Sequence, residues 1–453
     1  MQDVIKDYLK ELASKKGGVL RVCLLGLGST NASVLRAIRS LDIPITVTVR
    51  QNTELSDTPP YGVDLICGAH ATDGICEDVV FASPSYRRER LAIPSDTAVT
   101  SDTELFFQKR PKKIFAVSGS DGKSTVTTLA SLLLFPTFPK LFTGGNLGVP
   151  IAEAEMTCDA FVLELSSFNL RYCIPKCERS VLTNITPNHL NWHADFTEYA
   201  ECKHRLTEHS DEAVLTLTSP LLQEAARRRE SFALVCDTLS EGELRKSYAT
   251  RHTVTKEDGM ICIDGRGILP IENVRRRERH HLLNLMSAIG LTIGYTTPER
   301  IVEVASEFSG LGHRCEVFTV CGRDYVDSSI DTTPQRTATT LEGLAKEVSI
   351  ILGGRGKGLP FEPMREMLLR YAKRISVYGE IAHELYEWLS SDARLSLIPI
   401  GCFDTLSEAI DFAEDGDGAV LLCPAATSYG EFTSYAQRGS FFREYVLKKH
   451  RKI

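Results

Sequence analysis

The chain has 453 residues, of which 43% are hydrophobic and 25% are charged, and its formal net charge is −7. These values are typical of a soluble globular protein of about three domains, because a single core rarely serves more than about 250 residues. The negative charge argues against a general nucleic-acid-binding protein, no apolar run approaches the roughly 18 residues of a membrane span, and the charged start does not resemble a signal peptide. We therefore expect a cytoplasmic protein without a membrane or nucleic-acid partner.

The first part of the chain reads as a helix followed by a strand, a glycine turn and another helix. Residues 19–25 form an apolar strand that enters the turn at 26–31, and residues 45–50 are the next strand, a Rossmann-like arrangement. Asn31 stands where the dinucleotide fingerprint has its third glycine, and Arg50 where an acidic residue would hold a ribose. NAD is thus disfavoured, whereas a phosphorylated or uracil-bearing ligand is compatible with Arg50. A plain turn without a ligand is the alternative.

The second part carries a phosphate-binding loop. An apolar strand from Ile114 runs into the sequence GSDGKST at 119–125, which leads into a helix. Backbone N–H groups of such a turn surround phosphates, Lys123 neutralises them and the Ser124 hydroxyl ligates Mg²⁺. The second glycine comes two positions earlier than in the standard P-loop, so an ordinary glycine turn is the alternative.

Glu164 lies at the carboxyl end of an otherwise apolar stretch of the strand predicted at 160–168. Parallel α/β sheets place ligand-binding groups at such strand ends. A buried carboxylate needs a partner, and a Mg²⁺ shared with Ser124 and the phosphates is one. A hydrogen-bonded structural glutamate is the alternative.

A further strand, starting at Val181, ends in a polar loop that contains His189. A lone histidine is more often structural than a ligand. Lys203 follows fourteen residues later on a helix predicted at 197–206, among apolar neighbours that turn it inward. Because a buried lysine without a counter-charge is costly, Lys203 must be paired, neutral or chemically modified.

The remaining chain predicts a hairpin at 253–263, a basic run at 275–279 on a solvated face, and buried strands at 348–354, 374–379 and 419–424. Thirteen cysteines have no paired metal spacing, so we expect mostly buried thiols. The fold class is α/β, with a Rossmann-like domain at 1–108, a central P-loop ATPase-like domain with a parallel sheet at 109–310, and a Rossmann-like α/β domain at 311–453.

An ordered set of motifs resembles the Mur ligases, the ATP-dependent amino-acid-adding enzymes of peptidoglycan precursor synthesis. The set comprises 119–125, 144–146, 164–168, 184–190, Lys203, His280 with Asn284, and 312–314. Four segments are most similar to the D-glutamate-adding members: 164–168, 327–334, 353–357, and 428–432 with 437–439. The resemblance spans all three predicted domains and is far more specific than any single motif.

The resemblance implies a role for each matching residue. Lys123, Glu164, His189 and Lys203 would be catalytic; Ser124 and Glu164 would hold one Mg²⁺, and His189 a second Mg²⁺ together with Lys203 converted by CO₂ into a carbamate. The ATP-binding residues would be Gly119, Ser120, Asp121, Gly122, Lys123, Ser124, Thr125, Asn284, Arg314 and Asp327. The UDP-substrate-binding residues would be Gly28, Asn31, Arg50, Asn146 and Ser166, and the amino-acid-binding residues Thr332, Lys357, Ser428 and Tyr435.

The resemblance further implies a monomeric ligase that adds D-glutamate to UDP-N-acetylmuramoyl-L-alanine through an acyl phosphate. Three positions depart from the family pattern: His281 and Asn191 stand where asparagine and aspartate are common, and Ser329 or Ile330 stands where some relatives have lysine. How this last segment is aligned decides whether Asp327 or Ser328 contacts the ribose. A related ligase with another amino acid or a folate-type substrate is one alternative. A non-catalytic nucleotide-binding switch is another, although it gives no reason for the inward Lys203.

Overall fold

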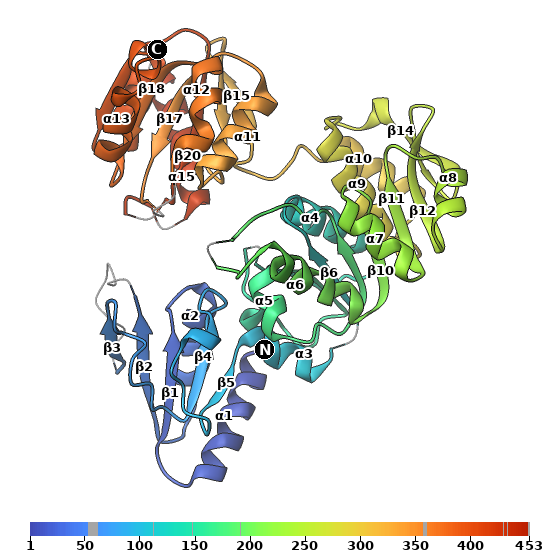
Figure 1. Ribbon diagram of the computed structural model, residues 1–453, viewed down its shortest axis with the longest axis vertical. Helices are drawn as coiled ribbons and strands as arrows, with labels where there is room; N and C mark the ends of the chain where they lie inside the picture. Colours follow the sequence, from blue (N-terminus) through green and yellow to red (C-terminus); the bar gives the residue numbers. More distant parts are fainter. Residues whose placement is uncertain are drawn as a thin grey trace. The chain divides into compact units, whose positions relative to one another are not determined.

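The computed structural model describes residues 1–52, 62–111, 113–146, 148–190, 192–356, 360–428, 430–432 and 434–451 (Figure 1). The chain divides into two compact units, Met1–Ser309 and Gly310–Ile453. The described residues form three sheets, of which two lie in the first unit and one in the second. The α/β class is confirmed, while the division of the first unit at residue 108 stays a prediction.

The first sheet is parallel and has the strand order β3-β2-β1-β4-β5. Its strands are β1 (Leu20–Leu25), β2 (Ile45–Gln51), β3 (Asp64–Cys67), β4 (Val79–Ala82) and β5 (Ala98–Thr100). Its helices are α1 (Gln2–Lys16), α2 (Ser29–Arg39) and α3 (Asp102–Lys109). Helix α1 buries Ile5 and Leu9, which are one helical turn apart, against this part of the core. The strands predicted at 19–25 and 45–50 are confirmed.

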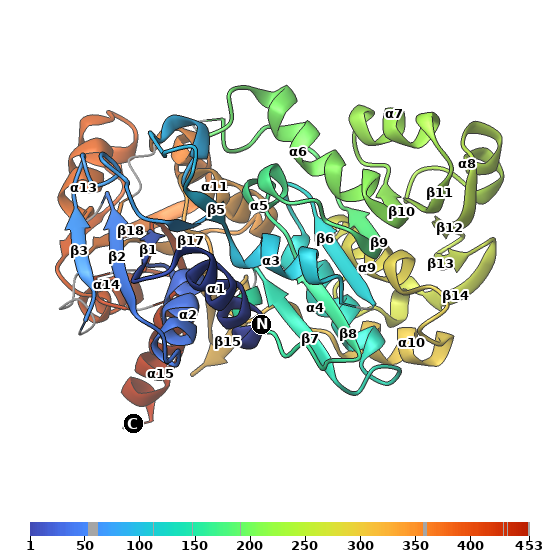
Figure 2. The ribbon, with the colours of Figure 1, turned by 90° about the horizontal axis from the view of Figure 1, so that it is seen from below.

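The second sheet has the order β14-β13-β12-β11-β10-β9-β6-β8-β7 (Figure 2). Strands β6 to β12 are parallel, and β13 pairs antiparallel with both β12 and β14. Its strands are β6 (Ile114–Ser118), β7 (Leu141–Gly145), β8 (Ala160–Glu164), β9 (Cys177–Leu182), β10 (Ser210–Thr216), β11 (Ser231–Cys236), β12 (Thr250–Glu257), β13 (Met260–Ile263) and β14 (Arg266–Pro270). Its helices are α4 (Lys123–Leu134), α5 (Ser167–Tyr172), α6 (Phe196–Glu208), α7 (Pro220–Arg228), α8 (Glu241–Ser247), α9 (Arg279–Thr292) and α10 (Pro298–Glu307).

Strand β6 lies between β8 and β9, its neighbours in the sheet. The chain therefore leaves β6 toward one side and later returns to the other, which is the topological switch point where parallel α/β sheets bind ligands. The loop that follows β6 is the predicted phosphate-binding loop. The fold thus places that loop where the sheet is best able to hold a ligand.

The strand predicted at 160–168 is too long. Strand β8 ends at Glu164, because the Ser166 side chain accepts a hydrogen bond from the Asn169 backbone N–H and caps α5. This reciprocal cap satisfies backbone groups that an extended strand would pair elsewhere. Glu164 is the last residue of β8, so it lies at the carboxyl end of the strand, as predicted.

The third sheet belongs to the second unit and has the order β15-β16-β20-β17-β18-β19, with only β15 antiparallel among the described strands. Its strands are β15 (Glu316–Val320), β16 (Arg323–Asp327), β17 (Val348–Gly353), β18 (Ala372–Tyr378), β19 (Ile400–Phe403) and β20 (Ala419–Ala425). Its helices are α11 (Pro334–Leu344), α12 (Arg365–Tyr371), α13 (Ala382–Ser391), α14 (Leu406–Glu414) and α15 (Tyr435–His450). Neighbouring β17 residues Ile350 and Ile351 enter different core clusters, so both faces of the sheet are covered.

Two further sequence expectations concern cysteines and membranes. The thirteen cysteines are unpaired, and the buried ones are Cys23, Cys173, Cys177, Cys202, Cys236, Cys262 and Cys423. In the part of the chain that the structure describes, no helix is both long and apolar enough to cross a membrane.

Candidate functional site

The loop after β6 approaches its neighbours so closely that it needs glycine at two positions. Gly119 and Gly122 have φ values of 146° and 81°. A Cβ atom on Gly119 would lie 1.9 Å from Thr183 Oγ1, and one on Gly122 would lie 2.2 Å from Asn284 Oδ1. Both positions exclude a side chain on steric grounds. The loop therefore packs closely against Thr183 and Asn284. It leads directly into the N-terminus of α4, the kind of helix end that binds anions.

Lys123 lies over the same loop. Its ammonium group donates to the carbonyl oxygens of Gly119 at 3.0 Å and Ser120 at 2.8 Å. The Asp121 N–H donates to Asn184 Oδ1 at 2.8 Å, which ties the loop to the segment after β9. The Lys123 ammonium group thus lies at the N-terminus of α4, where both its charge and the helix dipole stabilise an anion.

Glu164 and Ser124 meet beside the loop, as predicted from the sequence. The Ser124 hydroxyl donates to Glu164 Oε2 at 2.7 Å, and Asn146 Nδ2 donates to Oε1 at 2.9 Å. Glu164 is only 2% exposed, and it comes next to Val117 of the adjacent strand β6 in the parallel register. A buried carboxylate and a hydroxyl at this spacing are oxygen donors of the kind that Mg²⁺ prefers.

Lys203 points inward from α6, as predicted. It is 2% exposed, and its amine donates to Gly119 O at 2.6 Å. Burial, assisted by the nearby charge of Lys123, lowers the pKa of Lys203 well below its ordinary value. The buried side chain is therefore held toward its neutral amine form, which is nucleophilic.

His189 and Lys203 both border the ring of Tyr199. The His189 ring centroid lies 6.5 Å from that of Tyr199, and Lys203 Nζ lies 4.7 Å from it. The Tyr199 hydroxyl is 2.8 Å from Ser120 Oγ in the phosphate loop. His189 has a φ of 55°, an uncommon backbone conformation that tends to occur at functional sites. The loop, the histidine and the lysine thus gather around one aromatic side chain.

A cavity of about 270 Å³ lies between the first two sheets. Four of the residues predicted to bind the UDP-linked substrate line it, namely Gly28, Asn31, Asn146 and Ser166. Asn31 also donates to the carbonyl oxygens of Leu25, Gly26 and Phe81, so its amide holds the turn in place. The cavity joins the end of β1 to the loop region beside Glu164.

Arg50 does not line this cavity. Its side chain is buried, with Nε donating to Glu77 Oε1 at 3.0 Å and Nη1 to the carbonyl oxygens of Ala71 and Asp73. The guanidinium therefore stabilises the segment at 71–77. A role for Arg50 toward a ligand stays a prediction, because the contacts described here are internal.

Sequence reasoning missed other cavity residues. Ser83, Pro84 and Ser85 follow the buried strand β4 directly, and Thr103 and Asn169 come from the starts of α3 and α5. The polar Ser-Pro-Ser turn directly after an apolar strand could have indicated these residues, because the carboxyl ends of parallel strands lie at one edge of the sheet, where ligands bind.

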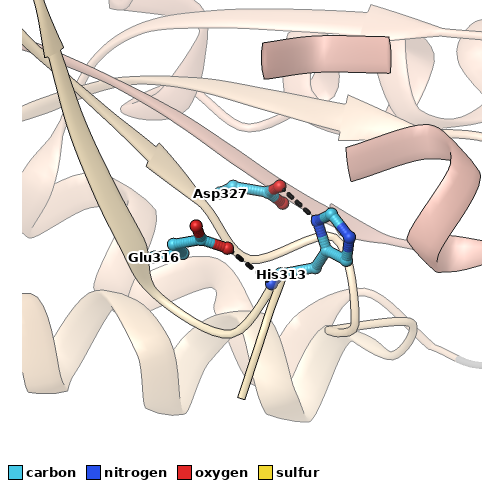
Figure 3. A group of neighbouring side chains, drawn as sticks. All are labelled: His313, Glu316 and Asp327. Carbon is cyan, nitrogen blue, oxygen red and sulfur yellow. Dashed lines mark hydrogen bonds and ion pairs between the residues drawn. The ribbon is translucent and has the colours of Figure 1, made fainter. Parts of the chain in front are cut away.

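In the second unit, His313, Glu316 and Asp327 form a compact cluster (Figure 3). His313 Nδ1 lies 2.6 Å from Asp327 Oδ2, and the His313 backbone N–H donates to Glu316 Oε2 at 3.1 Å. The bond to Asp327 raises the pKa of His313 above its ordinary value. One ligand atom from each residue lies within 4.8 Å of the others, and Glu316 also pairs with Arg443 at 2.7 Å.

The other predicted residues of the second unit lie near the carboxyl ends of its strands. Thr332 follows β16, Ser428 follows β20 and is 5% exposed, and Tyr435 is the first residue of α15. Lys357 lies outside the described residues. Arg314 follows His313, next to the ion pair with Asp327.

Arg438, which sequence reasoning overlooked, connects three of these strand ends. Its fully buried guanidinium donates to Ser329 O at 2.8 Å, Ala426 O at 3.1 Å and Gly353 O at 3.4 Å. One side chain thereby connects the segments after β16 and β20 with the last residue of β17, because a planar guanidinium can donate to several carbonyl groups at once.

Comparisons with known proteins agree with this architecture. Residues 117–292 match the Mur ligase middle domain. A UDP-N-acetylmuramoylalanine–D-glutamate ligase of Ruminiclostridium cellulolyticum is 29% identical, covering 98% of this chain and 99% of that protein. A ligase of the same name from Clostridium botulinum is 30% identical, covering 97% and 98%.

Solved structures share the fold over nearly the whole chain. UDP-N-acetylmuramate-alanine ligase from Thermotoga maritima has a TM-score of 0.60 at 17% identity, covering 96% of this chain and 100% of that chain. A MurF ligase from the same organism, solved in complex with ADP, has a TM-score of 0.52 at 16% identity, covering 96% of each chain.

Proposed function

The chain belongs to the Mur ligase family, and we propose that it joins D-glutamate to UDP-N-acetylmuramoyl-L-alanine in an ATP-dependent reaction. The observation that carries this proposal is the meeting of Ser124, Glu164 and Lys123 at the end of β6 and β8, beside a cavity lined by the predicted substrate residues. The nearly full-length similarity to ligases of this name supports the choice of substrates.

The first step is attack of the substrate carboxylate on the γ-phosphorus of ATP, which forms an acyl phosphate and releases ADP. Both reactants are anions, so the protein contributes mainly positioning and neutralisation of charge. Lys123 and the N–H groups at the start of α4 neutralise the phosphates, and Asn146 and Ser166 face the cavity that orients the muramoyl group. Mg²⁺ held by Ser124 and Glu164 would polarise the phosphoryl oxygens.

We propose that Lys203 carries a carbamate and holds a second Mg²⁺ with His189. The depressed pKa favours the neutral amine, whose nitrogen attacks CO₂ and loses one proton to give the carbamate anion. Among the described residues, the buried Lys203 amine has no carboxylate at hydrogen-bonding distance. The carbamate would replace this costly buried amine with an oxygen ligand for Mg²⁺.

The second step is attack of the D-glutamate amine on the acyl carbon, with loss of phosphate through a tetrahedral intermediate. We assign D-glutamate to Thr332, Lys357, Ser428 and Tyr435, and ATP also to Asn284, Arg314 and Asp327. The positions of Thr332 and Ser428 after parallel strands support this assignment. Neither a folate-type substrate nor a nucleotide switch is favoured by a particular contact.

A panel of acceptors tests the proposal. Phosphate release is measured with ATP and UDP-N-acetylmuramoyl-L-alanine, adding D-glutamate, L-alanine, meso-diaminopimelate or no amino acid, with a folate acceptor in a parallel series. We expect turnover only with D-glutamate. Turnover with another amino acid, or with the folate acceptor, would replace the proposed substrate by that one.

A further inference from the structure

The segment that follows β4 takes part in two sites at once. Ser83, Pro84 and Ser85 line the cavity, and the chain continues directly to Arg87. Trp192, in the loop that contains His189, donates from its indole N–H to Ser85 O at 2.8 Å. The wall of the cavity is therefore bonded to the loop that carries a proposed metal ligand.

Arg87 strengthens this connection with two more bonds. Its Nη1 donates to Trp192 O at 2.9 Å, and its Nη2 pairs with Glu198 Oε1 at 2.7 Å. The side chains of Arg87 and Glu198 are 13% and 16% exposed, so solvent screens this pair less than an open surface pair. One guanidinium thus bridges the His189 loop and the first turn of α6.

The elements that Arg87 holds are those that carry His189 and Lys203. The His189 carbonyl accepts the backbone N–H groups of Trp192 and His193, both at 3.0 Å, so fixing Trp192 fixes the turn around His189. Glu198 Oε2 accepts the Ala194 N–H at 2.6 Å, and Glu198 lies on α6 together with Lys203. Loop and helix therefore share the Glu198 carboxylate, which pairs with Arg87 and also with Arg171. Of these two arginines, Arg87 also bonds to Trp192 O.

We propose that Arg87 is a positioning residue that couples the cavity to the His189–Lys203 cation site, so that the UDP-linked substrate and a divalent cation each strengthen binding of the other. This inference rests on the proposed function, which supplies both ligands. A ligand that contacts Ser83 or Ser85 restrains the segment, and through Ser85 O and Arg87 it restrains the His189 loop and α6. The coupling is reciprocal by thermodynamic necessity.

The neighbouring residue Arg88 provides a matched control. Its Nη1 donates to Glu104 Oε1 at 3.0 Å, its backbone N–H donates to the Tyr172 hydroxyl, and its guanidinium carbon lies 4.3 Å from the Tyr172 ring centroid. Its side chain is 16% exposed, similar to that of Arg87. Arg88 thus has the same charge and comparable burial, but its contacts lead to α3 and α5 rather than to the His189 loop.

The test uses Trp192 as a local probe. The chain has two tryptophans, Trp192 and Trp388, so Trp388→Phe leaves Trp192 as the only one. Mn²⁺ is titrated by quenching of Trp192 fluorescence in bicarbonate-containing buffer, with and without saturating UDP-N-acetylmuramoyl-L-alanine. Substrate binding to each variant is measured separately by calorimetry, and far-UV circular dichroism verifies folding.

We expect the substrate to lower the Mn²⁺ midpoint about fivefold or more in the Trp388→Phe parent and in Arg88→Gln, a typical size for coupled sites. Arg87→Gln should clearly reduce this ratio while the substrate still binds, leaving only the coupling that the Trp192–Ser85 bond carries. Arg87→Lys should restore part of the ratio because a lysine reaches one of the two acceptors. Substrate binding without a change of midpoint in the parent, or an unchanged ratio in Arg87→Gln, would overturn the coupling alone. Absence of substrate binding to the parent would overturn the proposed function and the coupling together.

Discussion

At the residue scale, the central prediction concerns Lys123 and Glu164. Lys123→Ala and Glu164→Gln should each lower kcat by well over tenfold while leaving the fold intact, because they remove charge at the γ-phosphate and not core packing. The measurement is single-turnover formation of ADP, with the exposed Lys140→Ala as control. Activity within about tenfold of wild type, only about 1.4 kcal/mol in barrier height, would remove that residue from the catalytic set.

Lys203 gives a second prediction at this scale. Lys203→Ala should be nearly inactive, and a small carboxylate such as acetate should restore part of the turnover by replacing the carbamate anion in the vacated space. A small amine serves as the matched control, because it would rescue a lysine that acts as a cation. A ¹³C carbamate signal from wild-type enzyme equilibrated with labelled CO₂ provides independent evidence. Rescue by the amine and not by acetate would contradict carbamylation.

The His313–Asp327 pair predicts how stability depends on pH. The pKa of His313 is raised in the folded protein by its bond to Asp327, above an ordinary value of 6.5. Its contribution is therefore fully present below about pH 6.5 and is lost as the pH rises through the folded-state pKa. The difference in unfolding temperature between wild type and His313→Gln should be larger at about pH 6 than at about pH 9. A difference that grows with pH would reverse this account.

At the residue scale, the sequence predicted site residues correctly where the end of a strand or the start of a helix both places a side chain and supplies its reactive group. Ser124 and Glu164 were paired correctly because Glu164 ends β8 and Ser124 starts α4 after the loop that follows the neighbouring strand β6. Arg50 shows the limit, since its partner Glu77 is distant in sequence and neutralises it in the buried interior. No local pattern distinguishes an arginine that meets a ligand from one that meets a glutamate.

At the element scale, helix α15 needs Gly439 for packing and not for backbone conformation. A Cβ atom there would lie 2.2 Å from His313 Nδ1 and 2.6 Å from Asp327 Oδ2. Gly439→Ala should destabilise the protein by about 1–3 kcal/mol, since overpacking outweighs the gain in helix propensity. In the control Gly343→Ala on α11, nothing lies within 4 Å, and stability should rise by a few tenths up to about 1 kcal/mol. Urea unfolding measures both, and equal stabilisation by the two changes would refute the close contact.

The basic run at 275–279 shows why the contacts of charged side chains are hard to predict from sequence. Although several of its residues are exposed, Arg275 Nη1 donates to Glu307 O at 3.3 Å and Arg276 Nη1 to Ser309 O at 3.2 Å. The run therefore binds the carbonyl oxygens at the end of α10, where cations complement the helix dipole. A charge pattern alone indicates exposure, whereas the acceptors depend on which helix end is nearby.

At the scale of the whole molecule, alternating apolar strands and helices were sufficient to predict an α/β protein. Predictions were sharpest where strands were continuous and apolar, as in β6, β17 and β20. Strand β19 was not predicted, because it is short and only partly buried, and such strands carry little periodic signal. The cavity between the first two sheets also escaped prediction in part, since its walls come from segments far apart in sequence.

The most direct test of the proposed reaction follows an oxygen atom. UDP-N-acetylmuramoyl-L-alanine labelled with ¹⁸O in its carboxylate is incubated with ATP, D-glutamate and the enzyme, and the phosphate released is analysed by mass spectrometry. Because the carboxylate oxygen bonds to phosphorus in the acyl phosphate and leaves with it, we predict one ¹⁸O atom in each phosphate and one amide bond formed with D-glutamate. Unlabelled phosphate accompanying amide formation would contradict the acyl-phosphate mechanism.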